Sequence, residues 1–159
     1  MIHPVIRPAR PADAAAVAGL YLASRAAFLP FAPSVHSDVE VRRWMAGVLL
    51  PAGGVRVVDE GGTLRAMSAH AMDNGIGWIE QLYVEPGQTG RGLGAQLLHQ
   101  ALSELQAQAA AVVRLWCFQA NTGARRFYER QGFAAVAFTD GRDNEEGCPD
   151  VLYERAVTP

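Results

Sequence analysis

The chain lacks lysine entirely, and its 159 residues include only two cysteines and no apolar run long enough to span a bilayer. Without lysine it cannot contain a nucleotide-binding P-loop, because that loop ends in Gly-Lys-Ser/Thr and uses the lysine on the phosphates. The cysteines lie in a strand pattern (Cys117) and in a polar loop (Cys148), which indicates free thiols and no metal site. The N-terminal segment has no basic stretch followed by an apolar one, so we expect a cytoplasmic protein without a membrane partner.

A strong net charge is also missing. The 14 basic and 16 acidic residues leave a formal net charge of −2 at pH 7, so we expect no nucleic-acid partner. Apolar residues make up 50% of the chain, and a chain of this length buries one core. We therefore expect a single domain over residues 1–159.

Hydrophobic periodicity and turn residues predict a mixed α/β protein. A capping box, in which Ser37 and Glu40 satisfy each other's backbone donors, begins the second helix, and Gly132 ends the last one. An antiparallel meander of three strands precedes a helix that connects two parallel strands. The expected helices cover 14–28, 37–50, 93–105 and 122–130, and the expected strands cover 2–8, 55–59, 63–72, 76–84, 112–118, 133–139 and 151–155.

A glycine-rich turn in mid-chain, Thr89-Gly90-Arg91-Gly92-Leu93-Gly94, is the most informative segment. It follows an apolar strand and opens an amphipathic helix, so free backbone N–H groups meet the positive end of a helix. Such a turn binds pyrophosphate, because glycine has no Cβ to keep an anion away from the main chain. The Gly-x-Gly-x-Gly spacing, with a strand about 20 residues later where a ribose-binding acid is needed, fits a dinucleotide site poorly.

This turn and a second segment resemble two motifs of the GNAT superfamily of acetyl-CoA-dependent N-acetyltransferases. The family's cofactor motif reads Gln/Arg-x-x-Gly-x-Gly/Ala, which residues 89–94 match except that Thr89 replaces Gln or Arg. Residues 121–133 resemble the family's Asn-x-x-Ala-x-x-Phe-Tyr-x-x-x-Gly-Phe segment. The resemblance implies the GNAT acyltransferase fold, a mixed and mostly antiparallel sheet flanked by helices, with acetyl-CoA as the acetyl donor. The cofactor-binding residues that it implies are Leu82, Tyr83, Val84, Thr89, Gly90, Arg91, Gly92, Leu93, Gly94 and Asn121.

Acetyl transfer to an amine needs a base, because a lysine-like amine with a pKa near 10.4 is only about one part in 2,500 neutral at pH 7. Glu80 lies on the strand before the glycine turn, and period-two alternation predicts that it shares a face with Leu82 and Val84. We predict that Glu80 is the general base, directly or through water, and the alternative is a solvated strand residue. The resemblance implies that Tyr128 protonates the leaving thiolate, and the alternative is a core aromatic beside Phe127.

An acidic loop, defined as residues 140–150, holds five of the 16 acidic residues and a single basic one, Arg142. A solvated loop is the simpler interpretation. The alternative is that these acids attract a cationic amine such as a lysine side chain or a polyamine, since in GNAT folds this loop borders the acceptor side. His36, together with Phe28 and Phe31, is a weaker candidate for the acceptor entrance.

The main prediction is direct N-acetyl transfer in a ternary complex. The sequence leaves the acceptor open between a small-molecule and a peptide amine, and it leaves a homodimer open as the assembly. One alternative is a noncatalytic acetyl-CoA-binding sensor or interaction domain, which keeps the glycine turn but has lost turnover. The third hypothesis is a nucleotide-binding enzyme of another type.

Overall fold

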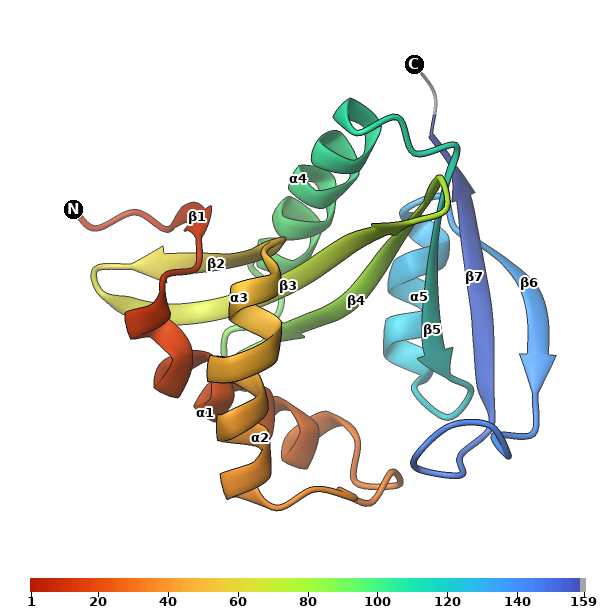
Figure 1. The fold of residues 1–159 in the computed structure, drawn as a ribbon, viewed down its shortest axis with the longest axis horizontal. Helices are drawn as coiled ribbons and strands as arrows, with labels where there is room; N and C mark the ends of the chain where they lie inside the picture. Colours follow the sequence, from red (N-terminus) through yellow and green to blue (C-terminus); the bar gives the residue numbers. More distant parts are fainter. Residues whose placement is uncertain (158–159) are drawn as a thin grey trace.

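In the computed structural model, which describes residues 1–157, a seven-stranded sheet runs through the middle of the protein (Figure 1). The strand order is β1-β2-β3-β4-β5-β7-β6, and all neighbouring strands are antiparallel except β4 and β5. This confirms the predicted mixed, mostly antiparallel sheet. The strands are β1 (Val5–Pro8), β2 (Val55–Glu60), β3 (Thr63–Asp73), β4 (Ile76–Val84), β5 (Val112–Phe118), β6 (Ala134–Thr139) and β7 (Asp150–Ala156).

Helices cover both faces of this sheet. The first three α-helices pack on one face, and the last two pack on the other (Figure 1). None of the helices within residues 1–157 is both long and apolar enough to cross a membrane. The helical segments are a 3₁₀ turn (Pro11–Asp13), α1 (Ala14–Phe28), α2 (Asp38–Trp44), a π-helical turn (Met45–Leu49), α3 (Leu50–Ala52), α4 (Leu93–Ala107) and α5 (Thr122–Arg130).

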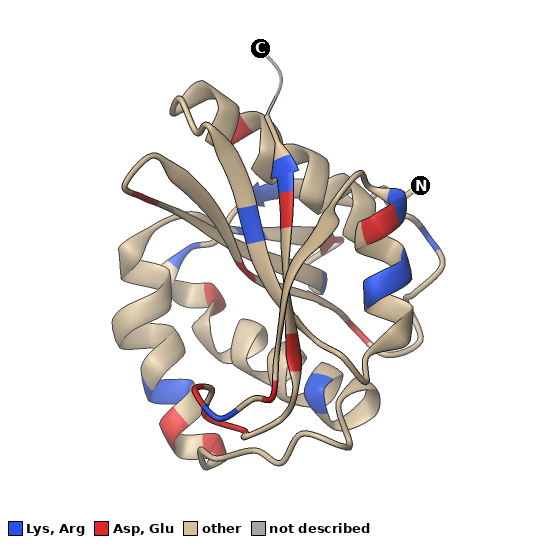
Figure 2. Ribbon diagram, turned by 90° about the vertical axis from the view of Figure 1, so that its right-hand side faces the viewer, with Lys and Arg blue, Asp and Glu red and all other residues tan. Residues whose placement is uncertain are grey.

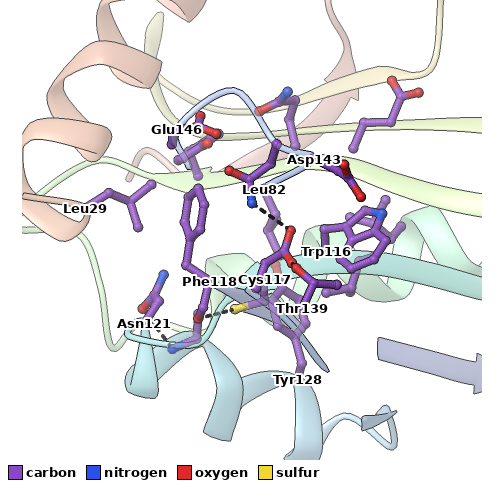
Figure 3. A pocket seen from close by; sticks show the side chains of 18 residues that line it. Leu29, Leu82, Trp116, Cys117, Phe118, Asn121, Tyr128, Thr139, Asp143 and Glu146 are labelled. Carbon is purple, nitrogen blue, oxygen red and sulfur yellow. Dashed lines mark hydrogen bonds between the residues drawn. The ribbon is translucent and has the colours of Figure 1, made fainter. Parts of the chain in front are cut away.

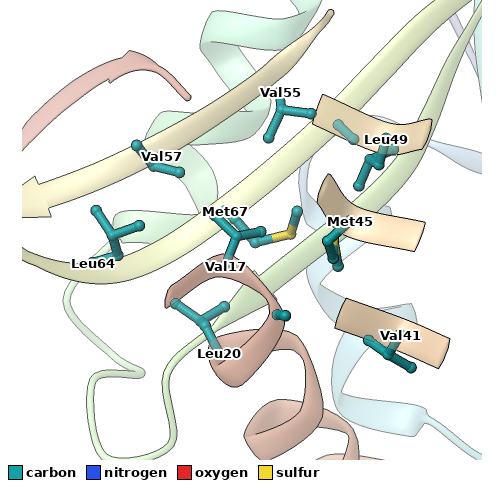
Figure 4. Close-up of a cluster of buried hydrophobic side chains, with 11 residues drawn as sticks. Val17, Leu20, Val41, Met45, Leu49, Val55, Val57, Leu64 and Met67 are labelled. Atoms are coloured by element: carbon teal, nitrogen blue, oxygen red, sulfur yellow. The ribbon is translucent and has the colours of Figure 1, made fainter. Parts of the chain in front are cut away.

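Two main clusters of buried side chains hold the layers together. On the α1 face, Val17 and Met45 pack with Met67 of β3 (Figure 4). On the opposite face, Leu98 of α4 and Tyr153 of β7 belong to a second cluster. Because each fully buried side chain of this kind contributes about 1.5–3 kcal/mol, these clusters fix the helices against the sheet.

The local predictions hold at the capping box, and they fail inside the second helix and at the start of the first strand. The Ser37 hydroxyl accepts a hydrogen bond from the backbone N–H of Glu40 at 3.2 Å, and the Glu40 carboxylate accepts one from the backbone N–H of Ser37 at 3.5 Å. The helix predicted over 37–50 is interrupted by the π-helical turn, which a 3.6-residue pattern does not reveal. The first strand begins at Val5 and not at Ile2, because its pairing with β2 starts there.

The strands β4 and β5 separate soon after they begin. Their parallel pairing covers only Ile76–Trp78 and Val112–Arg114, and beyond these residues they diverge (Figure 1). Within the described chain, the β5-facing edge of residues 79–84 therefore has no strand partner. Free N–H and C=O groups on such an edge can bind an extended, amide-rich ligand.

Glu80 forms a β-bulge on β4. Gln81 pairs with Ala69 and Ile79 pairs with His70, so the pairing with β3 skips Glu80. An extra residue of this kind shifts the alternation of side chains by one position.

The bulge corrects one prediction about the candidate base. Ile79 and Leu82 both pack into the cluster under α4 and α5, and Val84 packs against the start of α4, whereas Glu80 is exposed. The alternation on which we based a shared face for Glu80, Leu82 and Val84 is therefore interrupted at Glu80, although Glu80 and Leu82 line the same cavity. Period-two alternation holds only along an uninterrupted ladder.

Candidate active site

Two adjoining cavities open where β4 and β5 diverge. The glycine-turn cavity, of about 680 Å³, lies against the turn at residues 89–94 and the start of α5. The acidic-loop cavity, of about 490 Å³, lies between β4, β5 and the loop at residues 140–150 (Figure 3). The two share the lining residues Leu29, Leu82, Tyr83, Asn121, Ala124 and Tyr128, so they form one continuous site.

The glycine turn has a backbone conformation that favours glycine. Gly90 has φ +80° and Gly92 has φ +78°, in the left-handed region. Gly92 is the N-cap of α4, so the first N–H groups of that helix have no helical acceptor. A Cβ on either glycine would meet no heavy atom within 4 Å, which leaves room for a group to approach the backbone. These features fit a pyrophosphate at the positive end of a helix.

The side chains of the turn do not all face this space. Arg91 turns away, since its guanidinium donates to the Glu60 carboxylate at 2.6 Å and to the Gln88 side chain at 2.6 Å. The pKa of Arg91 is raised by its hydrogen bond to Glu60, which holds the charge there. A role for Arg91 in cofactor binding therefore depends on its backbone. The turn residues that line the cavity are Thr89, Gly90, Gly92, Leu93 and Gly94.

Side chains of α1 hold the C-terminal end of β4 in place, in addition to its pairing with β3. The Ser24 hydroxyl, which is fully buried, donates a hydrogen bond to the Val84 carbonyl at 2.6 Å. The Tyr83 ring lies edge-on to Tyr21, with centroids 5.0 Å apart, and burial raises its pKa to about 12. The predicted residues Leu82, Tyr83 and Val84 all line the glycine-turn cavity.

Asn121 begins α5 and lines both cavities. Its side-chain oxygen accepts a hydrogen bond from the backbone N–H of Ala124 at 3.3 Å, so Asn121 is the N-cap of this helix. Within residues 1–157 its amide NH₂ has no acceptor, so these donors are available to a ligand in either cavity.

Tyr128 lies where the two cavities meet. Its ring packs edge-on against Phe127 and Phe133, with centroid distances of 5.3 and 5.9 Å. Burial raises the pKa of its phenol, so the hydroxyl is protonated at neutral pH. No residue within 1–157 forms a hydrogen bond with this hydroxyl. It is therefore free to donate to a bound group.

Glu80 lines the acidic-loop cavity from its bulge on β4. The bulge turns the side chain away from the core that Ile79 joins, which is a common use of bulges beside functional sites. Its carboxylate has no ion-pair partner in the described part of the chain. Glu80 and Tyr128, the two predicted catalytic residues, thus approach the same cavity from β4 and from α5.

The acidic-loop cavity is lined by the carboxylates of Glu80, Asp143, Glu146 and Asp150. None of its described lining residues has a cationic side chain. Glu146 pairs with Arg25 of α1 at 3.4 Å. Asp150 is buried, and its carboxylate accepts hydrogen bonds from the Thr139 hydroxyl and from the Asn144 amide. The interpretation of residues 140–150 as simply solvated is therefore wrong for Asp150.

A second part of the acidic loop contacts the segment between α1 and α2. The ring of His36 lies between two carboxylates, with Nε2 3.1 Å from Glu145 and Nδ1 3.3 Å from Glu40. The Cys148 thiol donates to the Phe31 carbonyl at 3.7 Å. In Figure 2 acidic segments of the loop and of the first turn of α2 gather at the bottom of the molecule. These contacts bring His36 and Phe31 to the acidic loop, whereas Phe28, predicted beside them, lines the glycine-turn cavity.

We predict that the His36 contacts stabilise the fold only at low pH. The hydrogen bonds to Glu40 and then Glu145 raise the pKa of His36. A group whose pKa is raised on folding contributes fully below its ordinary value of about 6.5, and the contribution is lost as the pH rises through the folded value. His36→Gln should therefore lower Tm at about pH 5.5 and match wild type at about pH 9. An equal difference at both pH values would contradict the ion pairs.

Several residues that line the site were not predicted from the sequence. On β5, four consecutive residues line the acidic-loop cavity: Leu115, Trp116, Cys117 and Phe118. Their burial alternates, with Leu115 and Cys117 buried, so period two alone does not identify them as lining residues. Burial raises the pKa of the Cys117 thiol to about 11, which argues against a thiolate nucleophile. Within residues 1–157, no three His, Cys, Asp or Glu side chains are placed so that together they could hold a metal ion. Other lining residues that the sequence did not single out are Leu29, Thr139, Arg130 and Gln131.

Residues 20–133 match the family model described as the acetyltransferase (GNAT) family. A mycothiol acetyltransferase from Beutenbergia cavernae is 40% identical over 78 residues, which cover 49% of this chain and 26% of that protein. An uncharacterised N-acetyltransferase from Methanocaldococcus jannaschii is 36% identical over 55 residues, which cover 35% of this chain and 24% of that protein. The matched part thus covers about a quarter of the length of these two relatives.

Solved structures share the fold over nearly the whole chain. Ard1 from Thermoplasma volcanium superimposes with a TM-score of 0.79 at 18% identity and covers 98% of this chain and 99% of its own. The PaiA N-acetyltransferase from Thermoplasma acidophilum, solved with coenzyme A, has a TM-score of 0.76 at 17% identity. The match covers 97% of this chain and 99% of PaiA. YncA from Salmonella typhimurium, solved with acetyl-CoA, has a TM-score of 0.76 at 20% identity. The match covers 99% of this chain and 95% of YncA. At these identities the similarity establishes the fold.

Proposed function

The chain belongs to the GNAT family of acetyltransferases, and from that premise we propose that it transfers an acetyl group from acetyl-CoA to a primary amine. The transfer is direct, in a ternary complex, and residues 1–159 form a single N-acetyltransferase domain of the cytoplasm. The observation that carries the proposal is the junction of two cavities at Tyr128, one beside the glycine turn and one beside Glu80. Such a junction suits a donor and an acceptor that meet at one reacting centre.

The glycine-turn cavity suits the donor, which supplies the acetyl group when bound. The backbone of residues 89–94 binds the pyrophosphate, where Gly90 and Gly92 leave space and the start of α4 presents free N–H groups. The edge of Leu82–Val84 has no strand partner and binds the amides of the pantetheine arm, apart from the Val84 carbonyl, which Ser24 already occupies. The Asn121 amide donates from the other side. Thr89 lines the cavity where family members carry Gln or Arg.

Glu80 and Tyr128 divide the proton transfers. Glu80 takes one proton from the acceptor ammonium, directly or through water, which leaves a neutral amine. The N–C bond then forms as the C–S bond breaks, and Tyr128 gives its proton to the departing sulfur, so that coenzyme A leaves as a thiol. The second proton lost by the amine nitrogen restores the Tyr128 hydroxyl. Each of these steps is expected to contribute about 10²–10⁴-fold to the rate.

We expect Gly92→Ala to raise the Kd for acetyl-CoA by about tenfold or more. The new methyl group enters the space in front of the turn, and a left-handed alanine costs about 1–2 kcal/mol. Gly75→Ala is the matched control, because Gly75 has φ +80° and equally open surroundings but lies in the β3–β4 turn. Both variants should lower Tm, and only Gly92→Ala should weaken binding in isothermal titration. Equal affinity in the two variants would remove the turn from the donor site.

Two assays test the proposal in sequence. Thermal shift with acetyl-CoA, NAD and ATP tests the donor, and acetyl-CoA should give the only large increase in Tm. Release of free thiol from acetyl-CoA in the presence of an amine panel then tests the transfer. Binding of acetyl-CoA without acceptor-dependent release would support the noncatalytic sensor in place of the enzyme.

A further inference from the structure

The acidic-loop cavity holds more negative charge than the protein around it neutralises. Of its carboxylates, Glu146 is paired with Arg25. The basic residue of the acidic loop, Arg142, pairs with Asp140 at 3.0 Å and does not balance the cavity. The carboxylates that line the cavity without a cationic partner in the described chain are Glu80, Asp143 and Asp150.

Asp150 is the best-defined of these carboxylates. It is only 8% exposed, and the groups that donate to its carboxylate, the Thr139 hydroxyl and the Asn144 amide at 3.1 Å, are neutral. The Gln119 amide fixes the same region by donating to the backbone carbonyls of Thr139 and Asp150 at 2.9 and 3.1 Å. A buried carboxylate with only neutral donors gains further stabilisation from a cation in the adjoining space.

Aromatic rings line the same cavity. Trp116, which is 49% exposed, faces it from β5, together with Phe118. Figure 3 shows Trp116 and Asp143 at the same side of the cavity. A cation there is attracted both by the carboxylate and by the face of the indole ring.

The negative charge of the cavity carboxylates persists after the acceptor amine has lost its proton. When the reacting ammonium gives its proton to Glu80, amine and carboxyl group both become neutral. The charges of Asp143 and Asp150 are then still unbalanced, and the reacting nitrogen no longer compensates them. A group that stays cationic throughout the reaction pairs favourably with these carboxylates, above all with the buried Asp150.

We propose that the acceptor is a diamine or polyamine, whose second ammonium lies against Asp150 and Asp143 beside Trp116 while the first reaches Glu80. This inference rests on the proposed acetyl transfer and specifies its substrate class. Monoamines lack the second cation. Amino acids carry a carboxylate that these acids repel, so both classes bind less well.

The test uses acceptors with equal chain length and different end groups. Pentylamine, 5-aminopentanol, 1,5-diaminopentane and 5-aminopentanoate are titrated calorimetrically into the protein, with and without coenzyme A. The diamine should bind about tenfold more tightly than pentylamine and aminopentanol, and aminopentanoate should bind most weakly. Equal affinity for the diamine and pentylamine would overturn the inference.

Variants assign the preference to the named carboxylates. Asp143→Asn, at an exposed position, and Asp150→Asn should each reduce the ratio of diamine to monoamine affinity toward one. Glu145→Gln is the matched control, because Glu145 lies in the same loop but pairs with His36 and should keep the wild-type ratio. A ratio that survives both aspartate substitutions would also overturn the inference.

Binding and turnover separate this inference from the proposed function. Diamine-selective binding without CoA release from acetyl-CoA would count against acetyl transfer and support the diamine site. Acetylation of every amine at similar kcat/KM, without selective binding, would support acetyl transfer and overturn the diamine site.

Discussion

Tyr128→Phe is expected to lower kcat by about 10²-fold or more and to leave the Kd for acetyl-CoA unchanged. The substitution keeps the ring that packs against Phe127 and Phe133 and removes only the hydroxyl. Because that hydroxyl has no hydrogen-bond partner within residues 1–157, its loss should not lower Tm. Steady-state kinetics, calorimetry and thermal unfolding measure the three quantities.

Tyr153→Phe serves as the control, because we expect it to lower stability and to leave kcat unchanged. The Tyr153 hydroxyl is buried, donates to Glu129 at 2.6 Å and accepts from Arg125 at 3.1 Å. Its removal takes one charge-assisted hydrogen bond from each of these groups and should lower the free energy of unfolding by about 1–3 kcal/mol, with kcat retained. Wild-type turnover in Tyr128→Phe, or a loss of stability like that of Tyr153→Phe, would show that Tyr128 is only a core residue.

Glu80→Gln is expected to lower kcat/KM by about 10²–10³-fold at pH 7. The amide cannot take a proton, so the variant depends on the small fraction of acceptor that is already neutral, about one part in 2,500 for a pKa near 10.4. Since Glu80 is exposed on a bulge, the isosteric substitution should leave Tm unchanged.

The pH dependence distinguishes a base from a residue that merely binds the acceptor. Near pH 10 about a quarter of such an amine is neutral, so the deficit of Glu80→Gln should shrink steadily as the pH rises. Glu85→Gln is the matched control, because Glu85 follows the same strand but pairs with Arg65 at 2.8 Å and should behave as wild type. A deficit in Glu80→Gln that is the same at pH 7 and pH 10 would contradict the role as base.

The fold was predictable because its signals are local. The capping box of Ser37 and Glu40, the N-cap at Asn121 and the left-handed Gly132 after α5 all act within a few residues. The π-helical turn after Trp44 was not predictable, because one extra residue in a helix hardly changes the pattern of apolar positions.

The site was predictable in its residue types and less so in its geometry. The sequence indicated Glu80 and Tyr128, and both line one cavity. It could not show the bulge that re-aims Glu80, because a bulge depends on pairing with the neighbouring strand. It also gave no means to separate Asp150, which faces the cavity, from Glu145, which faces His36, since tertiary contacts decide where each acid of a loop points.

The central claim is that this protein catalyses acetyl transfer from acetyl-CoA to an amine, and acceptor-dependent thiol release tests it most directly. The purified protein is mixed with acetyl-CoA and each member of a panel of monoamines, diamines, peptides and amino acids, and the products are identified by mass spectrometry. We expect release of one coenzyme A for each N-acetylated amine, fastest with diamines and strongly reduced in Tyr128→Phe. Saturable binding of acetyl-CoA with no acetylated product from any acceptor would contradict the claim.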